Sequence, residues 1–107
     1  MKKLFPIFIA LILILSACAT DLRVNGFVNA INGTPIVNAT VTIERAKKTF
    51  ETTTDITGYY VFNNLTPGTW EITVEKEGFE TQSERFSING SGGNVYFRDF
   101  VLEKAKP

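Results

Sequence analysis

TDITGYYVF, residues 54–62, combines a tight turn with the strand that follows it, and the rest of the chain repeats this plan. Asp55 at the first turn position can accept hydrogen bonds from turn amides, and Gly58 at the fourth suits the exit from a type I turn. Tyr60 and Phe62 are two residues apart, so a β-strand places both side chains on one face. The segment therefore predicts a turn followed by a strand that buries Tyr60 and Phe62.

Short runs of β-branched and aromatic residues continue on both sides of this segment, and turn residues separate them. Upstream, Val41 and Ile43 alternate with polar residues, and downstream Trp70, Ile72 and Val74 do the same. From residue 22 onward, no stretch has apolar residues at helical spacing. We expect strands near residues 22–29, 39–44, 50–54, 60–62, 70–75, 80–88 and 95–103.

Seven strands with a turn signal about every 8–12 residues predict an all-β antiparallel sandwich of two sheets, with a closed barrel as the alternative. The last strand is ambiguous because both of its faces are apolar, so we expect either a bulge or an outer side that meets another surface. One face carries Tyr96, Phe100 and Leu102, and the other carries Val95, Phe97 and Val101.

Composition argues against most kinds of chemistry. The chain has no histidine and one cysteine, so the usual catalytic triads, zinc sites and haem ligands lack their parts. We therefore predict that the chain is not an enzyme, with no catalytic residues, no metal and no cofactor. Basic and acidic side chains are equal in number at eleven each, without a basic run, so nucleic acid is not an expected partner.

The N-terminus has the layout of a cleavable export signal. Lys2 and Lys3 precede an apolar stretch, residues 4–15, and small residues follow. A membrane span is the weaker interpretation, because a span needs about 20 apolar residues and Pro6 interrupts this shorter stretch. We predict a signal peptide over residues 1–17, and its removal leaves a single domain.

The tetrapeptide LSAC, residues 15–18, resembles a bacterial lipobox. The resemblance implies that Cys18 carries a diacylglyceryl group and becomes the first mature residue. Residues 18–21 would then be the lipidated cysteine and a short tether to a membrane. Ala19 stands where an aspartate would by analogy retain a lipoprotein at an inner membrane. In a cell with two membranes this favours the outer one.

Five short motifs resemble the carboxypeptidase regulatory-like domain family. They are GFV at 26–28, GTPIVNATV at 33–41, TDITGYY at 54–60, LTPGTW at 65–70 and GF at 78–79. The resemblance implies a transthyretin-type, or prealbumin-like, seven-stranded Greek-key sandwich. These motifs are mainly turn glycines and inward hydrophobic residues, so they imply a fold and no chemistry.

The resemblance spans nearly the whole mature chain. The domain would cover residues 22–104, followed by a tail at 105–107. Within it, strand alternation leaves three aromatic side chains, Phe27, Tyr59 and Phe97, on the outside. They form a candidate binding surface for a protein or glycan, with three scattered surface aromatics as the alternative.

These observations predict a non-catalytic lipoprotein of the cell envelope that binds a protein or glycan. The alternative is a structural accessory or scaffold subunit of an envelope complex. In that case the exposed edge of the last strand would extend the β-sheet of a partner. Aromatic residues clustered beside a groove would favour a glycan. An uncovered apolar strand face or edge would favour a protein.

Overall fold

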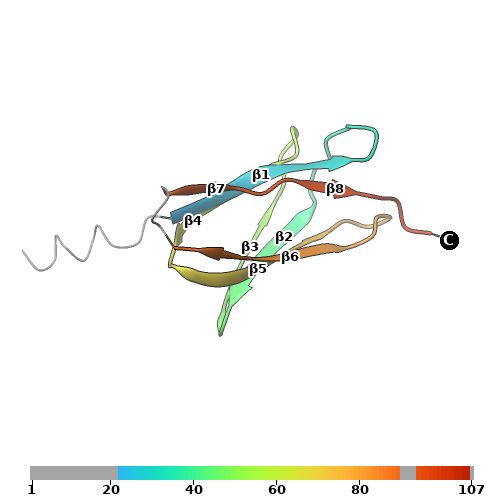
Figure 1. Cartoon of the computed structure of the whole chain (residues 1–107). Helices are drawn as coiled ribbons and strands as arrows, with labels where there is room; N and C mark the ends of the chain where they lie inside the picture. Colours follow the sequence, from blue (N-terminus) through green and yellow to red (C-terminus); the bar gives the residue numbers. More distant parts are fainter. Residues whose placement is uncertain (1–21, 90–93, 107) are drawn as a thin grey trace, which may run out of the picture.

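The computed structural model describes residues 22–89 and 94–106, which form two β-sheets packed face to face (Figure 1). Sheet I has the order β4-β1-β7, with β8 also paired to β1, and sheet II has the order β3-β2-β5-β6. The described residues contain no helix, and therefore none long and apolar enough to cross a membrane. The strands are β1 (Leu22–Ala30), β2 (Thr40–Arg45), β3 (Lys48–Thr53), β4 (Tyr59–Leu65), β5 (Gly68–Glu75), β6 (Gln82–Ile88), β7 (Val95–Phe97) and β8 (Phe100–Leu102).

The prediction of an all-β, two-sheet sandwich is confirmed, with two corrections to its details. The described residues form eight strands rather than seven, because the strand predicted at 95–103 is divided into β7 and β8. The pairing is also not wholly antiparallel. After β6 the chain crosses from sheet II to sheet I beside the start of β1, so Val95 pairs with Arg23 and both β7 and β8 run parallel to β1.

The core lies between the sheets and uses the alternate side chains of six of the eight described strands, all except β3 and β7. Tyr60 and Phe62 are buried as predicted, and so are Trp70, Ile72 and Val74. Each such side chain contributes roughly 1.5–3 kcal/mol through removal of apolar surface from water. The other buried hydrophobic residues are Leu22, Val24, Val28, Ile36, Ala39, Val41, Ile43, Leu65, Phe86, Ile88, Phe100 and Leu102.

The turn at residues 54–58 has the predicted geometry. The carboxylate of Asp55 accepts hydrogen bonds from the hydroxyl and the backbone N–H of Thr57, at 2.7 and 2.8 Å, and from the N–H of Tyr59 at 3.0 Å. These bonds, led by that of the Thr57 hydroxyl, lower the pKa of Asp55 below its ordinary value. Gly58 has a φ of 83°, a conformation that glycine adopts without steric cost.

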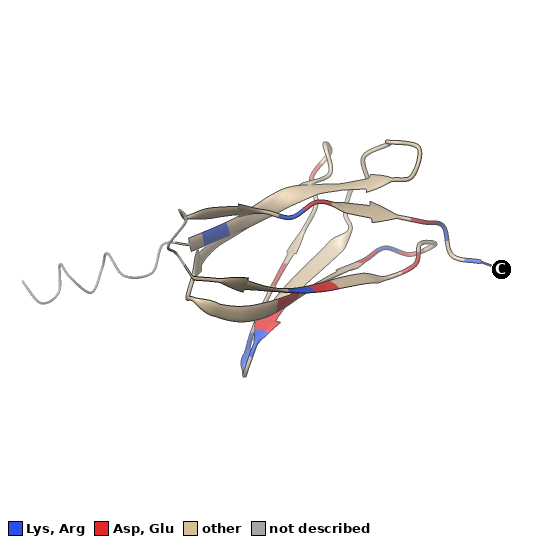
Figure 2. Cartoon of the chain, viewed as in Figure 1, with Lys and Arg blue, Asp and Glu red and all other residues tan. Residues whose placement is uncertain are grey.

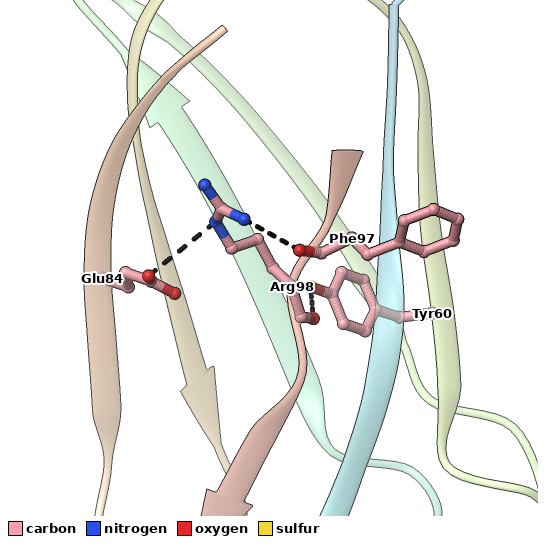
Figure 3. A network of polar contacts seen from close by, with 4 residues as sticks. All are labelled: Tyr60, Glu84, Phe97 and Arg98. Atoms are coloured by element: carbon pink, nitrogen blue, oxygen red, sulfur yellow. Dashed lines mark hydrogen bonds and ion pairs between the residues drawn. The ribbon is translucent and has the colours of Figure 1, made fainter. Parts of the chain in front are cut away.

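The division of the last strand depends on a glycine in β1. Gly26 occupies an inward position, and a Cβ there would collide with the carbonyl oxygen of Arg98. The chain between β7 and β8 dips into the space that the glycine leaves. The buried hydroxyl of Tyr60 donates a 2.6 Å hydrogen bond to the same Arg98 oxygen (Figure 3). The Asp99 carboxylate accepts one of 2.9 Å from the N–H of Phe27.

Candidate functional site

The outer face of sheet I is largely apolar. Phe97 is the most exposed of its large side chains at 69%, and Phe27 is 44% exposed. Neighbouring strands complete a surface that we call the apolar face. Its members are Phe27 on β1, Tyr59 and Val61 on β4, Val95 and Phe97 on β7, and Val101 on β8.

The three aromatic residues singled out from the sequence share this face. Phe27 and Tyr59 are cross-strand partners, and their ring centroids are 5.3 Å apart with the planes tilted by 57°. Phe97 pairs with Asn25, which lies two residues before Phe27 on the same side of β1. Phe27 and Tyr59 are thus in contact, and Phe97 lies on the strand at the other side of β1.

Asn25 lies beside these aromatic side chains, and its burial was not predicted from the sequence. It is only 7% exposed although strand alternation directs it outward. Its Nδ2 donates to the hydroxyl of Tyr59 at 3.0 Å, while its Oδ1 is buried and accepts no hydrogen bond within the part of the chain that the structure describes. The sequence signal for Asn25 was its place on the outward face of β1, where it lies between Arg23 and Phe27.

Charge is almost absent from the outer side of sheet I. Among the outward positions of its described strands, Arg23 is the one charged residue, and its Nε donates to Oδ1 of Asn63 at 2.9 Å. In Figure 2, β1, β7 and β8 are mostly tan, and the charges of this sheet lie at the start of β1 and at the link between β7 and β8. The face is therefore apolar with a weakly positive end.

The outer face of sheet II has the opposite character, and we call it the polar face. Hydroxyl groups face each other across its strands, at 3.0 Å between Thr69 and Ser87 and at 3.0 Å between Thr73 and Ser83. Carboxylates alternate with these hydroxyls along the strands. Its residues include Thr40, Thr42, Glu44, Glu51, Thr69, Glu71, Thr73, Glu75, Ser83, Arg85 and Ser87.

Arg98 closes the side of the sandwich between β6 and the divided strand (Figure 3). Its Nη1 donates to the carbonyl of Phe97 at 2.8 Å, its Nε lies 3.8 Å from a carboxylate oxygen of Glu84, and its guanidinium carbon is 4.5 Å from the ring centroid of Phe86. Burial, and then the negative charge of Asp99, raise the pKa of Tyr60 beneath this link. These contacts fix the backbone that carries Phe97.

Phe27, Tyr59 and Phe97 line none of four open hollows on the described surface. One of the two more apolar hollows, about 330 Å³, lies at the end of β1 opposite Leu22 and is lined by Val37, Phe79, Lys76 and Lys104. No group of three or more histidine, cysteine, aspartate or glutamate residues in the described ranges has a metal-binding arrangement. Cys18 lies outside the described residues.

Comparison with known proteins agrees with the motif resemblance. The model of the carboxypeptidase regulatory-like domain matches residues 23–103, which confirms the family expected from the five motifs. A viral relative, structural protein 27 of a virus (isolate Australia/Victoria), is 37% identical over 81 residues. That match covers 76% of this chain and 15% of the viral protein.

Solved structures share the fold at much lower identity. The backbone protein of pilus 2b from group B streptococcus is 14% identical with a TM-score of 0.66, over 80% of this chain and 42% of that one. Chlorocatechol 1,2-dioxygenase from Pseudomonas putida is 14% identical with a TM-score of 0.65, over 79% and 61%. The chain thus spans less than two thirds of each of these relatives, and the likeness to the solved structures shows the fold alone.

The dioxygenase likeness corrects one prediction. From its composition the chain was predicted not to be an enzyme, and that prediction is contradicted by enzymes that share the sandwich. A β-sandwich of this kind is compatible with catalysis in proteins that carry the necessary groups, so fold and composition do not suffice for the exclusion. What stands is the β-sandwich domain that the family model matches over residues 23–103.

Proposed function

Since the chain belongs to the carboxypeptidase regulatory-like domain family, we propose that it is a lipid-anchored scaffold module of the cell envelope. Cys18 tethers it to a membrane, and the apolar face is its contact surface with another envelope component. The rest of the surface, including the polar face, stays in water.

One observation carries this proposal: large apolar side chains gather on one outer sheet face and are nearly absent from the other. Phe27, Val95, Phe97 and Val101 are each at least 43% exposed on sheet I. Exposed apolar residues on a monomer are ordinarily scattered singly, and a contiguous group marks a surface that meets something. None of them fills the core, so folding alone does not require them.

The relatives support a scaffold role. One is named a structural protein and another a pilus backbone protein, and both names describe proteins that build assemblies. A glycan is the less favoured occupant of the contact surface, because sugar sites ordinarily combine aromatic residues with a hollow. Here the three aromatic residues line none of the four hollows described above.

The anchor is tested by fractionating cells that express the full chain. Cys18→Ala removes the thiol that the lipid would modify, so we expect the folded domain to move from the membrane to the soluble fraction. Thr20→Ala is the matched control, because it lies in the same tether and keeps the thiol. Membrane retention of the Cys18→Ala protein after a high-salt wash would contradict the anchor.

The contact surface is tested by photo-crosslinking in intact cells. A photoreactive residue at Phe97 reports on the apolar face, and the same residue at Thr73 reports on the polar face of the same domain. We expect envelope adducts, whether protein, glycan or lipid, from position 97 and few from position 73. Equal yields from the two positions would remove the assignment of the contact surface.

A further inference from the structure

We infer that the component covered by the apolar face is the lipid bilayer itself. The sandwich then lies flat, with sheet I on the membrane and sheet II toward water. This inference rests on the proposed function, because the lipid on Cys18 is what brings the face to the bilayer. Three features of the chain support it.

The first feature is the length of the tether. Only Ala19, Thr20 and Asp21 separate Cys18 from β1, a reach of about 10 Å when fully extended. Val95 pairs with Arg23, the second residue of β1, so the apolar face begins almost where the tether ends. It continues to Val101 near the other end of β1, a strand about 30 Å long. An upright domain would leave most of this face in water.

The second feature is the small number of free polar groups on the face. Four of its polar side chains bind one another, Arg23 to Asn63 and Asn25 to Tyr59. Asn29 is the remaining polar residue at an outward position of the described sheet I strands. A protein interface usually has about one direct hydrogen bond per 100–200 Å². Lipid requires no such directional partners, and aromatic side chains favour the boundary between headgroups and acyl chains. The chemistry of this face therefore suits a bilayer better than a protein surface.

The third feature is the distribution of charge between the two outer faces. Arg23 is the charged outward residue of the described sheet I strands, and it lies at the tethered end, where it can meet lipid phosphates. The polar face, which points to water in this orientation, carries four acidic residues and the basic Arg85, and Figure 2 shows acidic segments on the strands of sheet II. Anionic headgroups would repel these acidic residues. Charge therefore favours the same orientation as the exposed apolar side chains do, with sheet I on the membrane. The four acidic residues are Glu44, Glu51, Glu71 and Glu75.

The test measures the depth of single labels in the full lipidated protein. Phe97→Cys and Val101→Cys place a thiol on the apolar face, and Thr73→Cys places the matched control on the polar face. The lipid blocks the thiol of Cys18, so each variant has one reactive site for an environment-sensitive fluorophore. The proteins are reconstituted in vesicles of phosphatidylethanolamine and phosphatidylglycerol that contain nitroxide-labelled lipid.

We expect blue-shifted emission and strong nitroxide quenching at positions 97 and 101, and water-like emission at position 73. Quenching at 97 should fall when phosphatidylcholine replaces the anionic lipid. Equal quenching at all three positions in membrane-bound protein would overturn the orientation and leave the anchor intact. A label at 97 that is shielded in native envelopes but exposed in protein-free vesicles would also overturn it, in favour of a protein partner. Failure of the unlabelled protein to bind vesicles would instead contradict the proposed anchor.

Discussion

The two outer sheet faces are built from strands with the same alternation, yet one is apolar and the other is polar. On sheet II, each inward hydrophobic residue of β5 has outward threonine or glutamate neighbours. On sheet I, Phe27 and Phe97 occupy the corresponding outward positions. Alternation therefore fixes which residues enter the core, whereas the identity of the outward residues reports what each face meets.

The largest loss of stability is expected for a substitution that detaches part of the apolar face from β1. In Gly26→Ala the new Cβ would collide with the backbone of Arg98, which cannot shift without detaching β7 or β8 from β1. We expect the free energy of unfolding to fall by about 3 kcal/mol, the upper end of the usual overpacking range. Denaturant unfolding measures the loss, and amide exchange of Phe97 and Val101 reports whether the divided strand has detached.

Gly33→Ala is the control for this substitution. Gly33 also has a conformation that suits glycine, with a φ of 92°, but no atom lies within 4 Å of its added Cβ. Only backbone strain remains, about 1 kcal/mol. Equal losses for the two alanine variants would show that the close approach of Arg98 to β1 has no importance for stability.

A smaller effect is expected where the same link is held by one hydrogen bond. Tyr60→Phe removes the buried hydroxyl that donates to the carbonyl of Arg98. Loss of a partner for a buried acceptor costs about 1–2 kcal/mol. Thermal and urea unfolding at neutral pH would measure it, and an unchanged stability would indicate that the Arg98 carbonyl finds another donor.

The pH dependence of the same variant provides a second readout. Burial raises the pKa of Tyr60 above its ordinary 10.0 in the folded protein, whereas the unfolded chain ionises near that ordinary value. Proton loss therefore favours the unfolded chain at alkaline pH. The stability contribution of Tyr60 should be complete below about pH 10 and decline above it. The phenylalanine variant should show less of this decline.

The smallest effects on stability are expected for exchanges between the two faces. Phe97→Thr alters a side chain that is 69% exposed, so the free energy of unfolding should change by less than about 0.5 kcal/mol. Thr73→Val loses the contact with Ser83 and should cost about as little. Retention on a hydrophobic column should nevertheless fall for the first variant and rise for the second. Unequal stability losses would mean that one face contributes to the fold.

Local sequence signals predict a large part of the fold. Asp55 and Gly58 specify their turn through contacts within five residues, and Trp70, Ile72 and Val74 specify a buried face by alternation alone. Both signals act over a few neighbours in the chain, which is why they can be read without the structure. The outward positions of Phe27, Tyr59 and Phe97 follow from the same alternation.

Other features depend on residues that are distant in sequence. The division of the last strand needs Gly26 and Tyr60 beside Arg98, and the parallel pairing needs the crossing from sheet II to sheet I. Burial of the outward Asn25 requires Tyr59 and Phe97 on both neighbouring strands. No local pattern predicts these contacts. Alternation in the sequence indicates a strand and its buried face, but it does not indicate which strand lies beside it.

The parallel pairing of β7 and β8 with β1 also affects the order of folding. One edge of β1 can pair with β4 as soon as residue 65 has emerged, but its other edge is completed only by residues 95–102. The pairing of β1 is therefore complete only when the last strands have formed. The hydrogen bond from the N–H of Phe27 to the Asp99 carboxylate joins residues 72 positions apart. Such distant pairing slows folding and leaves a strand edge open to other chains. An export route that releases the chain from its N-terminus would keep this edge unprotected until residues 95–102 have crossed, which favours chaperone capture before the sandwich closes.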